Sequence, residues 1–141
     1  MGFQNSAPRV DDLSLFLESL TMWSQRADAA MITTEVPWEA LLGGTSAVDY
    51  AMENYGDLVE FYRSKNFKLW IFIDPQIGVD CSSDALELQA VNKSIAEADM
   101  QQMYRRFVVV MDSLFRPEHI GLALETNLIR DAAPSPLYEG V

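Results

Sequence analysis

An unbroken apolar segment, FKLWIFID at residues 67–74, constrains the fold of this chain more than any other feature of its sequence. If this segment is a strand, apolar residues lie on both of its faces, and Asp74-Pro75 ends it. A strand that is apolar on both sides is typical of a buried strand in a parallel sheet. Segments of this length are too short to span a bilayer. We therefore expect an α/β fold in which residues 67–74 form a buried parallel strand.

Helical and strand patterns alternate along the rest of the chain. Apolar residues at helical spacing predict helices over residues 11–27, from Val48 to Tyr62, and over 95–115 after a Ser94 cap. Short β-branched or apolar segments predict strands at about 29–34 and at 120–124, and a weaker last helix is expected near Asp131 or Ser135. The order α-β-α-β-α-β-(α) indicates right-handed βαβ units and a parallel sheet.

The length of 141 residues and a hydrophobic content of 49% are typical of one domain with a sizeable core. We expect a flexible leader at residues 1–10 and a single α/β domain over 11–141. The first expected element is a helix, and three strands leave two sheet edges and much apolar helix surface uncovered. These features predict that the domain is a fragment of a larger fold or that it self-associates.

The net charge of −11 argues against a nucleic acid or an anionic membrane as a partner. With one cysteine, Cys81, and one histidine, His119, the sequence indicates no cysteine cluster for a metal, and LLGGTS lacks the lysine of a phosphate-binding loop. We expect no cofactor. No signal peptide and no membrane-spanning segment is visible in the sequence, so we expect a soluble protein whose compartment the sequence does not indicate.

Each predicted strand is followed by an acidic residue at its carboxyl end, where α/β proteins place their sites. Glu35 follows the first strand, with Trp38 beyond it; Asp74 follows the second; Glu125 follows the third, with Asn127 beyond it. Carboxylates accept hydrogen bonds from sugar hydroxyls, an indole packs on a sugar ring, and glycoside hydrolysis uses a pair of carboxylates. We identify Glu125 as a candidate catalytic proton donor and the other four as candidate substrate-binding residues.

Each of these residues also has a structural interpretation. An acid at a strand end often only caps a turn or the next helix, which applies to Glu125 and Glu35. Asp74-Pro75 is a common strand stop, and Trp38 is more often a packing residue than a sugar platform.

Three segments carry a resemblance to a known family: RADAAMITTEVPWEALLGG, LWIFIDP and HIGLALETNLIRDAAP. They resemble the glycoside-hydrolase-like TIM barrels, the clan that includes endo-galactanases. The resemblance implies an incomplete (β/α)8 barrel that covers about strands 2 to 4, with a small three-layer α/β domain as the alternative. In that clan a glutamate at the end of the fourth strand is the general acid/base, and a second glutamate, the nucleophile, ends the seventh.

One further strand before residue 11 would make residues 120–124 the fourth strand and place Glu125 at the acid/base position. Leu124 stands where the clan usually has an asparagine, and Asn127 is a candidate substitute. The resemblance thus implies a fragment of a carbohydrate-active glycoside hydrolase, with its nucleophile outside the chain and no activity for the chain alone.

Two other functions remain open from the sequence. The domain could be a non-catalytic binding module for a polyol or for Ca²⁺ or Mg²⁺, with oxygen ligands from Asp74, Asp80, Asp84 and Glu125. It could also be a self-association or interaction module that uses its uncovered sheet edges.

Overall fold

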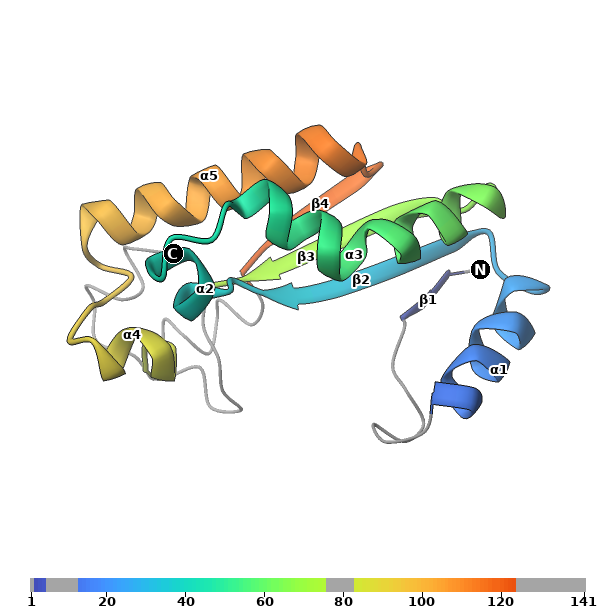
Figure 1. Cartoon of the computed structure of the whole chain (residues 1–141). Coiled ribbons are helices and arrows are strands. Elements are labelled where there is room, and N and C mark those ends of the chain that lie inside the picture. The colour runs from blue at the N-terminus through green and yellow to red at the C-terminus, as the bar shows by residue number, and fades with distance from the viewer. Residues whose placement is uncertain (1, 5–12, 76–82, 124–141) are drawn as a thin grey trace.

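The computed structural model of the chain describes residues 2–4, 13–75 and 83–123, and its centre is one parallel sheet (Figure 1). The four strands are β1 (Gly2–Gln4), β2 (Ala29–Glu35), β3 (Lys68–Asp74) and β4 (His119–Leu122). They lie in the order β1-β2-β3-β4, and every neighbouring pair is parallel. Each strand therefore pairs with the next strand in the sequence, and the chain crosses over in the same direction each time. The predicted mixed α/β fold with a parallel sheet is confirmed.

Three helices make the crossovers: α1 (Leu13–Ser24), α3 (Ala47–Ser64) and α5 (Ala98–Phe115). Figure 1 shows α3 and α5 running along one face of the sheet, with α1 beside β1. The strand residues that face them form one buried cluster with residues of all three helices. Its members include Leu20, Ala30, Ile32, Val59, Tyr62, Leu69, Ile71, Ile73, Phe107 and Met111. The described part thus has two layers, a sheet and a helix layer, and not the three layers of the alternative fold.

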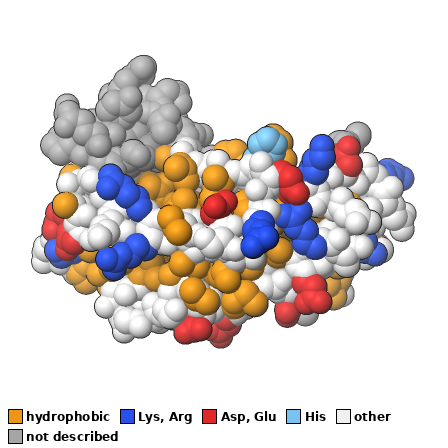
Figure 2. All heavy atoms as spheres, turned by 90° about the horizontal axis from the view of Figure 1, so that it is seen from above, with side chains coloured by type: hydrophobic (Ala, Val, Ile, Leu, Met, Phe, Trp, Pro, Cys, Tyr) orange, Lys and Arg blue, Asp and Glu red, His pale blue; other side chains and the backbone are white. Residues whose placement is uncertain are grey.

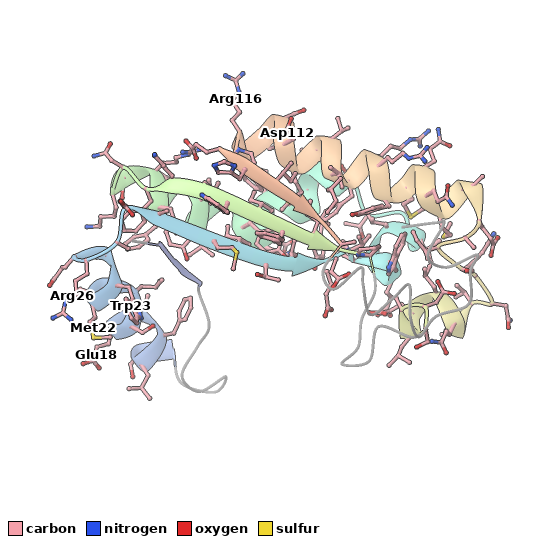
Figure 3. The ribbon with its side chains drawn as sticks, turned by 180° about the vertical axis from the view of Figure 1, so that it is seen from behind. Glu18, Met22, Trp23, Arg26, Asp112 and Arg116 are labelled. Atoms are coloured by element: carbon pink, nitrogen blue, oxygen red, sulfur yellow. The ribbon has the colours of Figure 1, made fainter. Side chains whose placement is uncertain are left out.

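The opposite face of the sheet is open where the structure describes it, which corrects the expectation that residues 67–74 are buried on both sides. In β3 the residues alternate, and Trp70 on the open face is 38% exposed. Figure 3 shows this face turned toward the viewer. The Trp70 ring lies 4.2 Å from the His119 ring of β4, centroid to centroid. The Phe72 ring lies against Gly121. A Cβ at this position would lie only 2.3 Å from the ring, so the contact requires glycine.

Three short elements were absent from the sequence-based prediction. Strand β1 lies within the predicted leader, so residues 2–4 are part of the sheet. Helices α2 (Trp38–Leu42) and α4 (Leu86–Ala90) lie in segments 35–46 and 75–94, for which the sequence predicts long loops after the first and second strands. Segments of three to five residues contain too few positions to show a period, which explains why the sequence did not reveal them. The helix expected near Asp131 or Ser135 lies outside the described residues.

Helix α5 begins after Glu97 and not after Ser94, which was expected to cap it. Ser94 instead belongs to the preceding turn, where its Oγ accepts a hydrogen bond from the Ala96 N–H at 3.1 Å. Its own N–H donates to Glu97 Oε1 at 3.0 Å. The turn therefore supplies the polar contacts of this helix start.

A charged contact holds together the amino end of the sheet. Arg63, in the last turn of α3, donates to Glu118 Oε1 at 2.8 Å and to the Arg116 carbonyl at 2.6 Å. Glu118 also accepts a hydrogen bond from the Leu69 N–H at the start of β3. The Arg63 guanidinium holds the pKa of Glu118 below its usual value, and the Leu69 N–H adds to this effect. The contact joins α3, β3 and the α5–β4 turn, while the Arg116 side chain points away from the sheet (Figure 3).

Candidate functional site

The carboxyl ends of β2 and β3 bring two of the predicted site residues together. Glu35 and Asp74 are register partners at the last position of their strands. The Val36 N–H donates to the Asp74 carbonyl at 3.0 Å, which keeps the two chains paired one residue further. Because paired positions of neighbouring parallel strands lie on the same face, both carboxylates belong to the open-face set of residues. The predicted proximity of these two strand ends is present in the structure.

A cavity of about 370 Å³ opens beside Glu35. Its lining comes from the end of β2 and the residues after it, from α3 and from α4. The lining residues are Thr33, Thr34, Glu35, Val36, Pro37, Tyr50, Tyr55 and Glu87. We call this cavity the β2 pocket. Its size is that of a small-molecule site, and hydroxyl and carboxyl groups make up much of its wall.

Hydrogen bonds order one wall of the β2 pocket. The buried Thr34 hydroxyl lies 3.0 Å from the Glu35 carbonyl, to which it donates, and 2.5 Å from the Tyr55 hydroxyl. Since Thr34 has one hydroxyl hydrogen, Tyr55 is the donor in the second bond. The Tyr50 and Tyr55 rings pack edge to face at 6.5 Å, and Tyr50 packs in the same way on Phe107 of α5 at 6.4 Å. These contacts hold both tyrosines in place beside Glu35.

The surroundings of the β2 pocket favour protonation of Glu35. Burial raises the pKa of Glu35 above its usual value, and the carboxylates of Glu87 and Asp74 raise it further. As a residue Glu35 remains exposed, so solvent screens these interactions and limits their energetic effect. Burial, the neighbouring Tyr55 and the Glu35 carboxylate raise the pKa of Tyr50. A group with a raised pKa at the end of a strand is a candidate proton donor or ligand contact.

Glu87 extends the acidic character of this pocket from the side of α4. Its Oε2 atom is buried and has no hydrogen-bond partner among the described residues. The lining residues of the β2 pocket include no lysine, arginine or histidine. A hydrogen-bond donor or a cation that reaches a carboxylate oxygen in such surroundings stabilises it.

Trp38 does not have the exposed ring that the sequence-based interpretation as a sugar platform requires. Its side chain is 0% exposed, and its indole N–H donates to the Pro75 carbonyl at 2.9 Å. The hydrogen bond connects the start of α2 with the residue that follows β3. Trp38 therefore supports the backbone on which Glu35 and Asp74 stand, and the structure corrects its predicted role to a packing role.

Glu125 and Asn127 lie outside the described residues, as do Asp80 and Cys81. Asp84, another member of the hypothetical cation site, accepts a hydrogen bond from the Ile95 N–H at 2.8 Å and so stabilises the segment around α4. Within the described ranges no three histidine, cysteine or acidic residues are grouped closely enough to hold a metal ion.

Sequence reasoning missed Glu87, Tyr50 and Tyr55 as site residues. Tyr55 fitted the apolar stripe of its helix, and Glu87 lay in a segment without clear periodicity. Only the packing of α3 and α4 against the end of β2 places these residues beside Glu35. One signal was present in the sequence: two tyrosines five residues apart follow a strand that ends in an acid.

Comparison with known proteins returned no matching family model, no similar curated protein and no similar solved structure. No helix in the described part of the chain is both long and apolar enough to cross a membrane. On the face seen in Figure 2, lysine and arginine side chains lie among acidic and hydrophobic ones rather than in a patch of their own. The fold and the β2 pocket therefore carry the functional argument.

Proposed function

We propose that the chain is the first half of a glycoside-hydrolase-like (β/α)8 barrel and that its carboxyl-end pocket binds carbohydrate. Four parallel strands in sequence order, with the crossover helices on one side, are the repeating arrangement of such a barrel. The open sheet face would then line the barrel interior, where bulky side chains such as Trp70 and Phe72 are expected. With β1 counted as the first strand, β4 takes the fourth position.

The observation that carries this proposal is the β2 pocket, because barrel enzymes place their sites beyond the carboxyl ends of the strands. Its carboxylates can accept hydrogen bonds from sugar hydroxyls, and the Tyr50 and Tyr55 rings offer apolar surface for the carbon face of a sugar. In this proposal Glu35, Asp74 and Asn127 contact the substrate, and Glu125, which follows β4, is the general acid/base. The nucleophile lies outside the chain.

Carbohydrate binding by the chain itself tests the proposal without requiring turnover. We would titrate the full 141-residue chain with neutral gluco-, galacto- and manno-oligosaccharides and record binding by calorimetry. At least one series should bind, and Glu35→Gln should weaken that binding because a neutral amide is a poorer acceptor than a carboxylate. Glu60→Gln is the matched control, since Glu60 is an exposed residue of α3 outside the pocket.

Two results would overturn the binding proposal: no oligosaccharide binds, or Glu35→Gln and Glu60→Gln behave alike. The role of Glu125 needs the complete barrel, in which Glu125→Gln should abolish hydrolysis and leave the melting temperature unchanged. Full activity of that variant would remove the acid/base assignment.

Self-association is a second candidate function that the open sheet face favours. Trp70 is 38% exposed on this face, next to Phe72 on the same strand. Apolar surface of this kind often marks a protein interface. Sedimentation of the chain at increasing concentration should then reveal a dimer that Trp70→Glu weakens and Val109→Glu, on the exposed side of α5, does not. A chain that remains monomeric throughout would exclude this candidate.

A further inference from the structure

A second cavity, of about 550 Å³, opens between helices α2 and α4, and we call it the α2–α4 cavity. Its lining differs from that of the β2 pocket, because none of the described residues that line it carries a hydroxyl group or an aromatic ring. Most of its wall is aliphatic and comes from Leu42, Leu86, Ala90 and Val91, with the acidic residues Glu39 and Glu87 beside them. A cavity of this size, with an apolar lining and few polar groups, is typical of a small-molecule site.

The apolar side chains around the α2–α4 cavity are in contact with solvent. Leu42, Leu86 and Val91 are 37%, 67% and 52% exposed. Each of the two helices has five residues and buries one large side chain, Trp38 in α2 and Leu88 in α4, so these three aliphatic residues remain on the outside. An apolar group that enters the cavity removes this surface from water, which stabilises the complex.

The α2–α4 cavity continues the β2 pocket along the same two segments of the chain. The segment that leaves β2 lines the β2 pocket at residues 35–37 and the α2–α4 cavity at three positions between 39 and 43. Helix α4 contributes to both, since Glu87 belongs to the wall of each. Figure 1 shows α2 and α4 together at the end of the sheet where β2 and β3 end. A polar and an apolar cavity thus meet at Glu87, and a ligand that fills both has one polar and one apolar part.

We propose that the two cavities together bind a sugar that carries an aliphatic group at its anomeric carbon. The sugar ring occupies the β2 pocket, and the first methylenes of the aliphatic group occupy the α2–α4 cavity against Leu42, Leu86 and Val91. The inference rests on the proposed carbohydrate function and names the class of substrate, a glycoside with an aliphatic aglycone. No bond is made or broken in this binding step.

The extent of this apolar surface favours a small ligand over a protein partner. A stable protein interface buries roughly 800 Å² of each partner. Three exposed aliphatic side chains on two helices of five residues each supply much less than that. They suffice for a short alkyl chain, because a small ligand in a cavity buries most of its own surface.

The test titrates the full 141-residue chain with methyl, butyl and hexyl glycosides of glucose, galactose and mannose, below the concentrations at which they form micelles. The Kd of each is measured by calorimetry. Each methylene that enters the cavity should tighten binding about threefold, so at least one hexyl glycoside should bind at least about tenfold more tightly than its methyl counterpart. The heat capacity change of binding should become more negative along the same series. 1-Hexanol, an alkyl chain without a sugar, should bind more weakly than the hexyl glycoside.

Two substitutions of exposed leucines locate the alkyl chain. Leu86→Gln places an amide in the wall of the α2–α4 cavity and should reduce the preference for the hexyl glycoside to less than about threefold. Leu114→Gln is the matched control, since Leu114 is 38% exposed on α5 and lines neither cavity, and it should retain the preference. A preference that is the same in both variants would show that the alkyl chain binds elsewhere and would overturn the inference.

Three results on the unmodified chain would also overturn the inference, and they separate it from the proposed carbohydrate function. Equal Kd values for methyl and hexyl glycosides would remove the apolar subsite and leave carbohydrate binding intact. If 1-hexanol binds as tightly as the hexyl glycosides and no methyl glycoside binds, carbohydrate recognition fails and only an apolar site remains. If sedimentation shows a dimer that Leu86→Gln dissociates, a second copy of the chain covers the cavity in place of a glycoside.

Discussion

The acidic residues at the two ends of the sheet have opposite electrostatic surroundings. At the amino end, the Glu118 carboxylate has a guanidinium and a backbone N–H as partners, and its pKa is lowered. At the carboxyl end, Glu35 lies near two further carboxylates, and its pKa is raised. Glu118 directly precedes β4 and Glu35 ends β2, so both acids lie at strand termini of one sheet, and the difference between them comes from the neighbouring groups that the fold supplies.

This contrast separates residues that hold the fold from residues that are available for a ligand. A carboxylate whose hydrogen-bond acceptors are filled stabilises the native state and has little left to offer a substrate. Repulsion between neighbouring carboxylates destabilises the folded state, and a bound donor or cation removes that repulsion. The comparison predicts that substitutions at the amino end lower stability, whereas substitutions of the pocket acids affect binding and leave stability nearly unchanged.

Substitution of Trp38 should have the largest effect on stability, although it lies at the carboxyl end. Trp38→Ala removes a fully buried ring and its bond to the Pro75 carbonyl, and we expect the free energy of unfolding to fall by about 3–5 kcal/mol. Urea denaturation measures the loss, with Trp70→Ala, on the open face, as a matched control that should cost much less. Similar losses for the two variants would contradict the packing role of Trp38.

Arg63→Ala tests the amino-end contact. The variant loses the hydrogen bonds to Glu118 and to the carbonyls of Phe115 and Arg116, and we expect the free energy of unfolding to fall by about 1–2 kcal/mol. This value is modest because the Arg63 and Glu118 side chains remain 35% and 40% exposed. Arg105→Ala, on the exposed side of α5, should change it by less than about 0.5 kcal/mol. An equal effect of both substitutions would show that the contact adds nothing to stability.

Only part of the stability loss in Arg63→Ala should depend on pH. Because the pKa of Glu118 is lowered in the folded state, its contribution is complete above the usual value of 4.5 and is lost as the pH falls through the folded value. The difference between wild type and Arg63→Ala should therefore shrink as urea titrations move from pH 7 into this acidic range. A difference that is constant with pH would assign the Arg63 effect to its carbonyl contacts alone.

Glu35→Gln should have the smallest effect on stability and the opposite sign. The raised pKa of Glu35 means that the folded state binds this proton more tightly than the unfolded state, so stability falls as the pH rises from the usual value of 4.5 through the folded value. Above that range Glu35→Gln should stabilise the chain by no more than about 0.5 kcal/mol, since the group is partly screened by water. Thermal melts at pH 7 and pH 4 measure the change, and destabilisation at pH 7 would contradict repulsion among the pocket acids.

Sequence patterns predicted much of the fold because its longer elements bury one regular stripe of residues. Helix α3 was found close to its observed bounds from a period of 3.6 residues, and strand β3 from a continuous apolar segment that Asp74-Pro75 ends. The open face of β3 was not predicted, since an apolar side chain such as Trp70 does not indicate whether another layer covers it. Strand β1 was missed because its three residues join the sheet only through pairing with β2.

The candidate site also contains residues that the sequence predicted and residues that only the tertiary structure reveals. Glu35 and Asp74 were identified from their positions after strands, which is local information, and their register pairing is a consequence of the parallel sheet. Trp38 is fully buried, and its indole N–H bonds to the Pro75 carbonyl 37 residues further along the chain, a contact that no local pattern predicts. Glu87 and Tyr50 join the site through the packing of α4 and α3, which no local pattern describes.

The sequence by itself therefore determined the alternation of helices and strands, the parallel sheet and the acids at the strand ends, because each depends on periodicity or on immediate neighbours. The tertiary structure decided which of those acids are paired and which repel, since that depends on atoms from distant segments meeting at one end of the sheet. It also decided that Trp38 is buried and Trp70 exposed. Two tryptophans of the same chemistry thus differ in role because one is fully buried with its N–H bonded to the Pro75 carbonyl and the other lies on the open face of the sheet.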